Sequence, residues 1–407
     1  MMTGRQLDGA IVIGSEYRQL GIIRSLGRHG VPVWVLRGDH WLGGASRYAR
    51  RTLRWPSGSD AERLAFLIEL SQKHGLENWA LYPGGDTETA LIAQHHADLS
   101  HLYVLTTPPW SVMRAAHDKR LTYRLAADLG IDHPWTHVPR DRADLEQLEC
   151  TFPVILKPAM KEELNALTAA KAWRVDDRAA LLDRYDVACT LVDPSLLMVQ
   201  ELVGGGGDAQ FSYAALADRG RPVASIVARR TRQWPVDFGR SSTFVETIHS
   251  PAVVELGERV VAALGFTGLV EVEFKRDART GGYKLLDINP RVWGWHTVGR
   301  AAGVDFPVLM WERLSGRSVG PLVGKPGVRW VHAVPDAAMA IKEIARGRLS
   351  PFRYLWSLRP PIEPAVFALD DPVPALIELP MVLYLLWNRR EEFASLISPP
   401  TLAQGRN

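Results

Sequence analysis

The sequence predicts an α/β protein that opens with a parallel sheet. Residues 10–14, AIVIG, form a short β-type run that ends in glycine, and residues 31–36, VPVWVL, form a second one. Between them, residues 19–30 place apolar side chains near one helical face and end at Gly30. A strand, a helix and a second strand in this order are typical of a parallel sheet with a right-handed crossover.

The composition limits the class of protein. The 407 residues are enough for two or three domains, and 46% apolar with 23% charged residues is ordinary for a globular chain. A net charge of +3 gives no support to a general nucleic-acid binder. The two cysteines, Cys150 and Cys189, cannot build a disulfide framework and lack metal-ligand spacing, which favours a reduced, cytoplasmic setting.

No segment predicts a transmembrane helix. The first apolar run is too short for the core of a secretory signal, and no stretch approaches the ~20 apolar residues that span a bilayer. Residues 379–387, LPMVLYLLW, come nearest and precede Arg389 and Arg390. We expect a buried helix there, with a peripheral membrane or partner contact as the alternative.

The remaining elements divide the chain into three parts. Residues 1–110 form the first domain, in which residues 79–95 repeat the strand, glycine turn and helix and residues 102–109 add a strand. Residues 111–318 form the second part. It is expected to contain, in order, one helix over 111–129, a strand at 152–158, and a strand followed by four glycines within 195–210. Paired strands over 211–249, a helix over 252–265 and a β-hairpin over 269–291 follow. Residues 319–407 are expected to form a partly helical extension whose role the sequence leaves open.

The hairpin is the most informative segment. Because side chains alternate across a strand, one face should be directed to a core by Val270, Val272, Phe274, Leu286 and Ile288. The opposite face would then carry Glu271, Glu273, Leu285, Asp287 and Asn289.

An acid on each arm of the hairpin suggests a metal site. Two carboxylates side by side repel each other unless a cation lies between them. Mg²⁺ prefers oxygen ligands and binds together with substrate phosphates, so Glu273, Asp287 and Asn289 are candidate ligands. Arg291 adds a fork-shaped donor suited to phosphate. The alternative is a row of solvated polar side chains on an amphipathic hairpin.

The pattern of E-F, a short hairpin and then acid-x-Asn-x-Arg resembles the metal-binding signature of the ATP-grasp superfamily, in particular its carboxylate–amine ligase and biotin-carboxylase-like branch. The resemblance spans about residues 111–312. It implies a two-lobed α+β domain behind the N-terminal α/β domain. It also implies that Glu273, Asp287 and Asn289 hold Mg²⁺, with Mn²⁺ as an alternative, on the phosphates of ATP. The second acid of the family is usually Glu, whereas here it is Asp287.

Two lysines extend the resemblance. Lys157 ends the apolar run FPVILKP, where burying an ammonium group is costly without a partner, and the family has a phosphate-contacting lysine at this strand position. Lys119 matches the lysine that opens the family's ATP-binding region. The alternatives are a lysine that reaches out from a strand end and an ordinary lysine on a helix surface.

Residues 198–208, MVQELVGGGGD, resemble the hinge between the two lobes of the family. The resemblance implies that Gln200, Glu201 and Val203 lie along the adenine edge and that Asp208 holds ribose hydroxyls. The four glycines have neither the G-K-[ST] of a P-loop nor the G-x-G-x-x-G spacing of a dinucleotide site, so a flexible turn is favoured.

Two further segments are compared with the family, an arginine-rich segment and the segment where many members have a glycine-rich lid. VARRTRQWP, residues 227–235, is either a solvated basic face or the source of the cation that the family places over the phosphates, and Arg230 is our candidate. Arg230 and Arg291 are therefore the two expected catalytic residues. The glycine-rich lid of many family members is absent, because residues 158–173 contain no glycine.

These implications predict an ATP- and Mg²⁺-dependent ligase that activates a small carboxylate as an acylphosphate and couples it to a small amine. A homodimer is left open. The alternatives are an ATP-binding module without catalysis and a bicarbonate-activating carboxylase, although the chain lacks a biotin-accepting A-M-K-M. Trp293, Trp295 and His296 are expected to pack in the core, with an acceptor pocket as the alternative, and residues 14–16 and 84–86 are candidate acceptor contacts.

Overall fold

The N-terminal sheet is parallel, as the opening β-α-β pattern predicts. The computed structural model describes residues 6–160, 165–234 and 241–388. The first strands are β1 (Gly9–Ile13), β2 (Val33–Arg37), β3 (Ala49–Arg54), β4 (Trp79–Tyr82) and β5 (Val104–Leu105). They form one five-stranded sheet in the order β3-β2-β1-β4-β5, and all neighbours are parallel.

Helices cover both faces of this sheet. They are α1 (Tyr17–Arg28), α2 (Asp60–His74), α3 (Asp86–Gln94) and α4 (His96–Leu99). The alternation of β1 explains the arrangement: Ala10 and Val12 share a core with α1, whereas Ile11 and Ile13 share a different core with the other three helices. Both faces of β1 are therefore buried.

The single helix expected over 111–129 is wrong, because the chain breaks it in two. The structure has α5 (Trp110–His117) and α6 (Lys119–Asp128), separated by Asp118 in an extended conformation. The Asp118 side chain accepts a hydrogen bond from the backbone N–H of Arg120, so it caps α6. The break places Lys119 at the first position of α6.

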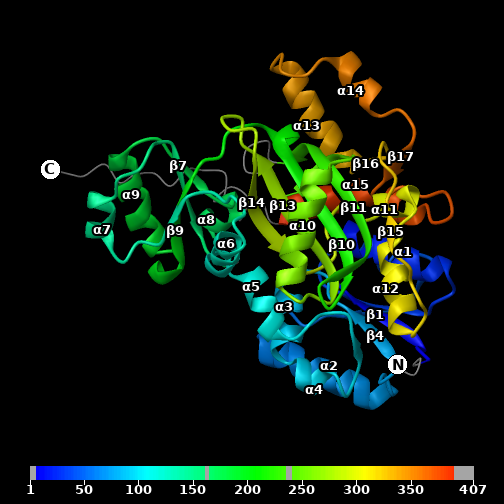
Figure 1. Ribbon diagram of the computed structural model, residues 1–407. Coiled ribbons are helices and arrows are strands. Elements are labelled where there is room, and N and C mark those ends of the chain that lie inside the picture. Colours follow the sequence, from blue (N-terminus) through cyan, green and yellow to red (C-terminus); the bar gives the residue numbers. More distant parts are fainter. Residues whose placement is uncertain (1–5, 161–164, 235–240, 389–407) are drawn as a thin grey trace.

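A separate lobe follows, which stands apart on the left of Figure 1. Its strands are β6 (Thr136–His137), β7 (Val154–Pro158), β8 (Trp173–Val175) and β9 (Leu197–Glu201), in the antiparallel order β6-β9-β7-β8. Its helices are α7 (Arg142–Gln147), α8 (Ala166–Ala170), α9 (Arg178–Cys189) and the 3-10 turn η1 (Pro194–Leu196). The buried residues of its core all lie between residues 145 and 199.

A large mixed sheet forms the centre of the molecule. After the 3-10 turn η2 (Gly207–Ala209), its long strands are β10 (Gln210–Asp218), β11 (Arg221–Trp234), β12 (Ser241–Thr247), β13 (Gly268–Arg276) and β14 (Tyr283–Asn289). Helix α10 (Pro251–Ala263) packs on one face through Val253, Val260 and Val261. The predicted paired strands, helix and hairpin of this region are confirmed.

The C-terminal extension completes the sheet and adds helices. Two of its strands, β16 (Arg329–Val331) and β17 (Ile362–Pro364), continue the sheet beyond β12, and β15 (Leu322–Val323) pairs with β11. Helices α11 (Val298–Ala302) and α12 (Phe306–Leu314) precede the extension, and α13 (Ala333–Ala345), α14 (Pro351–Ser357) and α15 (Val373–Asn388) belong to it. Within the described residues, none of the helices combines the length and apolarity that crossing a bilayer requires.

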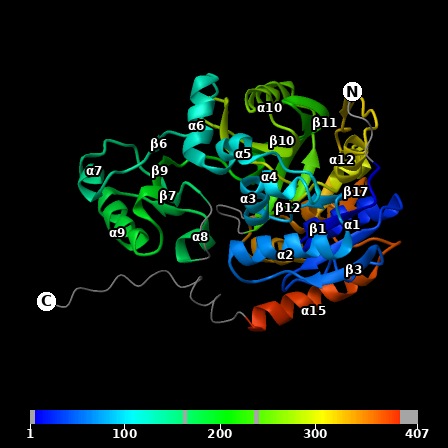
Figure 2. The same ribbon diagram turned by 90° about the horizontal axis from the view of Figure 1, so that it is seen from below.

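One continuous core joins the N-terminal sheet, the large sheet and the extension. It contains Ala10 and Leu20 from the N-terminal domain, Trp293 and Phe306 from the middle of the chain, and Met381 from α15. Figure 2 shows α15 alongside the N-terminal domain, where the Trp41 ring lies 5.4 Å from that of Tyr384. The N-terminal domain and the large sheet therefore form one body, from which the lobe of residues 136–201 is separate.

Candidate active site

The three predicted metal ligands come together on the β13–β14 hairpin. In the antiparallel register, Glu273 lies opposite Asp287 and Glu271 lies opposite Asn289. Asn289 Nδ2 donates to Glu273 Oε1 at 2.8 Å and to Glu271 Oε2 at 3.1 Å. The side chains of both strands thus share one surface, as the alternation predicts.

The alternation is wrong at one point of β14. The pairing shifts between Glu273 and Phe274, so that Phe274 faces Leu285 and Leu286 is the extra residue of a β-bulge. Leu285 is consequently fully buried in the core below α10, although we expected it on the opposite face, and Leu286 is only half-buried. The bulge keeps the apolar residues inside without moving Asp287 off the acidic surface.

Glu271 belongs to this cluster, although the sequence reasoning gave it no role. Its Oε1 accepts from Trp295 Nε1 at 3.0 Å and its Oε2 accepts from Asn289, and it is 3% exposed. Burial, reinforced by the charge of Glu273, raises the pKa of Glu271 to about 7. The alternation of side chains already placed Glu271 on the same face as Glu273, and this pattern could have identified it as a member of the site.

Lys119 contacts the predicted metal-binding acid directly. Its Nζ donates to Asp287 Oδ1 at 2.8 Å and to Asp287 Oδ2 at 3.0 Å. Burial alone would lower the pKa of Lys119, but the Asp287 carboxylate outweighs it and the pKa is raised. Lys119 is therefore a fully charged ammonium group at the acidic surface.

Lys157 lies at the end of β7, on the lobe side, and has weaker partners. Its Nζ donates to Tyr123 Oη at 3.3 Å and lies 5.7 Å from the centre of that ring. Burial, with a further contribution from the charge of Lys119, lowers the pKa of Lys157 to about 7. A half-buried lysine whose side chain donates to a phenol fits a site that receives an anion. Tyr123, which the sequence reasoning missed, also donates to Leu286 O at 3.0 Å and so links the lobe side to β14.

Arg230 completes the cationic side. It lies 3.2 Å from Glu273 Oε1 and donates to Gln210 Oε1 at 3.1 Å, while its buried Nε has no acceptor among the described residues. Burial would raise the pKa of Glu273, but the charges of Arg230 and Lys171 outweigh burial and lower it. Lys171, which follows α8, is thus a further cation that the sequence reasoning missed.

Arg291 is directed to the N-terminal domain. Its Nε and Nη2 form a two-point ion pair with Asp86 at 2.7 and 2.9 Å, and Nη2 also donates to Asn289 Oδ1 at 3.3 Å. Asp86 opens α3 at the carboxyl end of β4, where the sequence predicted an acceptor contact. Arg291 therefore connects the acidic hairpin to the loops of the parallel sheet.

The same loops bring a second charged group to this region. Glu16, which caps α1, lies 3.2 Å from Arg18 and 3.6 Å from His40. Gly84 is required nearby, because a Cβ there would lie 1.9 Å from Ile13 O. This close approach holds the ends of β1 and β4 together.

The predicted hinge residues separate into two groups. Gln200 is buried in β9, where its Nε2 donates to Thr136 Oγ1 at 2.8 Å, and Val203 is also buried. Glu201 accepts from Lys284 at 2.6 Å and from Arg279, so it joins the lobe to the β13–β14 hairpin through its side chain. Asp208 is exposed in η2. Their roles toward adenine and ribose stay predictions.

The aromatic residues after β14 are structural. Trp293 and Trp295 are buried in the shared core, and His296 is 2% exposed with its Nδ1 3.0 Å from Trp293 O. Burial lowers the pKa of His296 to about 4, so its imidazole is neutral at neutral pH. The expectation of core packing is confirmed.

The donor set fits a metal ion that is bound together with phosphates. Among the described residues, no group of three or more His, Cys, Asp or Glu side chains has metal-ligand geometry. Glu273, Asp287 and Asn289 supply two carboxylates and one amide oxygen, fewer ligands than Mg²⁺ takes. The half-buried Lys157 and the buried Arg230 beside them fit the phosphates that would complete the coordination.

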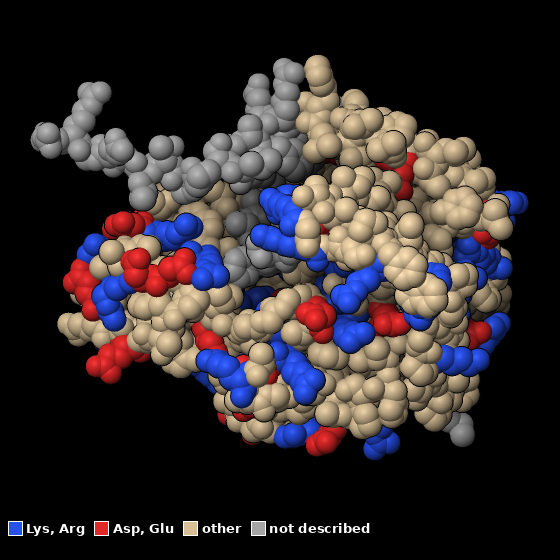
Figure 3. All heavy atoms as spheres, turned by 90° about the horizontal axis from the view of Figure 1, so that it is seen from above, with Lys and Arg blue, Asp and Glu red and all other residues tan. Residues whose placement is uncertain are grey.

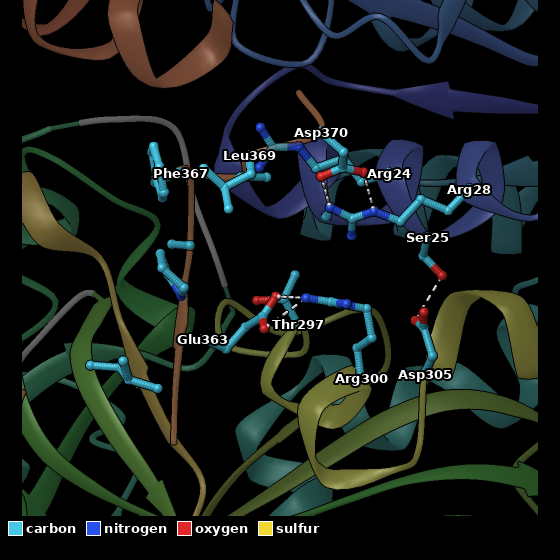
Figure 4. A pocket seen from close by; sticks show the side chains of 15 residues that line it. Arg24, Ser25, Arg28, Thr297, Arg300, Asp305, Glu363, Phe367, Leu369 and Asp370 are labelled. Carbon is cyan, nitrogen blue, oxygen red and sulfur yellow. Dashed lines mark hydrogen bonds and ion pairs between the residues drawn. The ribbon is translucent and has the colours of Figure 1, made fainter. Parts of the chain in front are cut away.

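A cavity of about 410 Å³ lies elsewhere, between α1, α11 and β17 (Figure 4). Its charged walls neutralise each other: Arg28 pairs with Asp370, Arg300 pairs with Glu363, and Ser25 donates to Asp305 Oδ1. This balance of charges distinguishes the cavity from the acidic hairpin, where the buried Arg230 Nε has no acceptor in the part of the chain that the structure describes.

The comparisons with known proteins find the ATP-grasp signature in the part of the chain that carries the hairpin. Residues 195–333 match the family described as ATP-grasp in the biosynthetic pathway with Ter operon. This part of the chain, which carries the hairpin signature, is therefore similar to ATP-grasp proteins.

The known proteins that this chain resembles include ligases and a carboxylase. The chain is 23% identical over 230 residues to D-aspartate ligase from Enterococcus faecium, and the match covers 53% of each protein, so it spans about half the length of that relative. Among solved structures, the L-amino acid ligase from Bacillus licheniformis has a TM-score of 0.60 at 15% identity over 76% of this chain and 75% of that one. Biotin carboxylase from Campylobacter jejuni, solved as a β-γ-ATP complex, has a TM-score of 0.61 at 15% identity over 77% of this chain and 72% of that one.

Proposed function

We propose that this chain is an ATP- and Mg²⁺-dependent ligase that joins a carboxylate to an amine. The observation that carries the proposal is the surface on which Glu273, Asp287 and Asn289 lie beside Lys119 and Arg230. Oxygen ligands bordered by cations complement a metal-bound polyphosphate. The names of the relatives, D-aspartate ligase and L-amino acid ligase, support an amino acid as one substrate.

The acidic hairpin and Lys119 would act together when a nucleotide enters. Mg²⁺, when bound, would neutralise phosphate charge and orient the γ-phosphate. Lys119 donates to both oxygens of Asp287, and a phosphate offers this ammonium group an alternative acceptor. Asp287 would then face the cation instead of the lysine, so both charges remain compensated throughout.

Lys157, Arg230 and Arg291 would hold the reacting groups. A nearby phosphate raises the pKa of Lys157 from about 7, so Lys157 would take up a proton and bind as an ammonium group. Arg230 would stabilise the charge that develops on the transferred phosphoryl group. Arg291, held by Asp86, would keep the loops of the N-terminal sheet over the site, where an acceptor substrate binds.

The reaction that follows needs no buried base. A carboxylate oxygen attacks the γ-phosphorus and the bond to ADP breaks, which gives an acylphosphate. An amine nitrogen then attacks the acyl carbon, inorganic phosphate leaves, and the amine loses a proton to solvent. We propose that this occurs in the cytoplasm.

The experiment is a substrate matrix with the purified protein. ADP release is measured with Mg²⁺ and ATP across amino acids, other carboxylic acids and amines, for the wild type, for Asp287→Ala and for the matched control Asp183→Ala, an exposed acid on α9. Release that needs one acid and one amine, is lost in Asp287→Ala and is kept in Asp183→Ala supports the ligase.

The other outcomes of the matrix are equally informative. ADP release with bicarbonate alone would replace the ligase by a carboxylase. Tight, Mg²⁺-dependent ATP binding without turnover would favour a non-catalytic module, and failure to bind ATP would overturn the whole proposal.

A further inference from the structure

The C-terminal helices expose large apolar side chains. Phe352, Leu355 and Trp356 of α14 are 72%, 67% and 59% exposed, and Leu376, Leu383 and Trp387 of α15 are 74%, 58% and 69% exposed. We refer to these six residues as the apolar surface. Scattered apolar side chains are normal on a soluble protein, but a group of this kind indicates an interaction site.

Helix α15 is held beside the segment that leads into α13. His332, which precedes α13, lies with its Nε2 2.6 Å from Glu378 Oε1 in the middle of α15. Seen from the side of α13 and α14, Figure 3 shows a broad area with few charged side chains, with both Lys or Arg and Asp or Glu side chains around it.

Helix α15 has the composition of an element that is covered on both sides. Its only charged residue, Glu378, is buried against His332, and Met381 and Pro374 on the same side are also buried. The opposite side carries Leu376, Leu383 and Trp387. A helix that is apolar all round is ordinarily buried all round.

The charged residues near the apolar surface indicate which kind of partner it would bind. Residues 341–359 contain five cationic residues, Lys342, Arg346, Arg348, Arg353 and Arg359, and one acidic residue, Glu343. Glu343 lies within ion-pair distance of Arg346 and Arg348. Apolar and tryptophan side chains beside an excess of cations are the composition of helices that lie in the interface of an anionic membrane.

We propose that α14 and α15 dock this chain on the surface of an anionic lipid bilayer. The helices would lie in the plane of the interface, with Phe352, Leu355 and Trp356 inserted below the headgroups and Arg353 among the phosphates. A second copy of the chain is less suitable, because a twofold contact would bring the same cations of both copies together. The inference is independent of the proposed ligase activity.

The test is co-sedimentation of the full chain with vesicles. One set contains phosphatidylcholine alone, and the other contains equal parts of phosphatidylcholine and phosphatidylglycerol. We expect binding to the mixed vesicles that is about tenfold or more stronger than to the neutral vesicles and that weakens with added salt.

Variants separate this surface from nonspecific adhesion. Trp356→Ser and Arg353→Glu should each weaken binding to the mixed vesicles by about tenfold. The matched controls, Val138→Ser and Arg174→Glu, change exposed residues of the lobe and should bind as the wild type does. All four residues are exposed, so unchanged thermal unfolding verifies that the variants fold.

Two results would overturn the proposal. One is a chain that ignores both kinds of vesicle and forms a dimer which Leu355→Glu dissociates, since the surface would then be an interface between copies. The other is binding that the controls weaken as much as Trp356→Ser and Arg353→Glu do.

Discussion

The two sides of the candidate site are built in different ways. The acidic side, β13 and β14, belongs to a body whose shared core draws buried residues from positions as far apart as 10 and 381. The lysine side, β7 with Lys157, belongs to a lobe whose core draws only on residues 145–199. One side is fixed by distant parts of the chain, and the other by its own neighbours.

Because of this difference, the charged groups of the acidic side and of the lysine side are held in place in different ways. Asn289 donates to both Glu271 and Glu273, and Glu271 and Asn289 are buried, so the acidic side is preorganised for a cation. Lys157 reaches the body through Tyr123, and Glu201 adds ion pairs to Lys284 and Arg279. The lobe can therefore adjust its position to a nucleotide more readily than the hairpin can.

The first prediction concerns the stability of the shared core and of the lobe core. Phe306→Ala removes a ring that packs 4.8 Å from Trp293 in the shared core, and we expect the free energy of unfolding to fall by about 3–5 kcal/mol. Leu181→Ala makes the matching change in the lobe core. Hydrogen exchange should show that Leu181→Ala loosens residues 136–201 and leaves β13 and β14 protected. Equal loss of protection in residues 136–201 and in β13 and β14 would contradict the separation of the lobe core from the shared core.

The next effect concerns the acidic side. Glu273→Gln keeps the shape of the side chain but removes the charge that faces Arg230 and Asp287. We expect the rate constant for ADP release to fall by about 10²–10³-fold. Glu69→Gln, an exposed change on α2, serves as the control and should have no effect. Full activity of Glu273→Gln would remove this residue from the metal site.

A smaller effect concerns the lysine side. Because the pKa of Lys157 is about 7, part of the lysine must take up a proton when phosphate binds at neutral pH or above. ATP affinity should therefore fall as the pH rises above about 7, and Lys157→Met should weaken binding by about tenfold. Calorimetry in two buffers of different ionisation enthalpy measures the proton uptake. Lys157→Arg should bind ATP without that uptake, and an unchanged uptake would assign it to another group.

The smallest effect is a pH dependence of stability. Burial raises the pKa of Glu271 from 4.5 to about 7, so the folded protein binds the proton more tightly than the unfolded chain does. The contribution to stability is complete below pH 4.5 and is lost as the pH rises toward about 7. Urea unfolding across this range should show a decrease in stability that Glu271→Gln makes shallower. An equal slope in both proteins would contradict the assignment.

The sequence was sufficient for features that repeat locally. A period of two residues predicted that Glu273, Asp287 and Asn289 share a face of the hairpin, and the β-α-β opening predicted the parallel sheet. Both depend on near neighbours in the chain, which is why the pattern could be read without a structure.

Long-range pairings were not accessible in this way. No local pattern indicates that β16 and β17 extend the large sheet, or that Arg291 pairs with an acid more than two hundred positions away, Asp86. The break at Asp118 was missed because the apolar period continues across it, while the cap that causes it depends on one side chain. Lys171 and Tyr123 carry no motif, and only the packing of the lobe against the body brings them to the site.

The bulge in β14 has a consequence for insertions and deletions. Leu286 is the surplus residue, and without it Glu273 would still face Asp287 and Phe274 would still face Leu285. A chain shortened by this one residue would keep every facing pair of the hairpin. It would lose the carbonyl that accepts from Tyr123 Oη, and with it a hydrogen bond that ties the lobe side to the acidic strand. Leu286 is thus dispensable for the register of the hairpin, but it is required for the hydrogen bond that connects the two sides of the site.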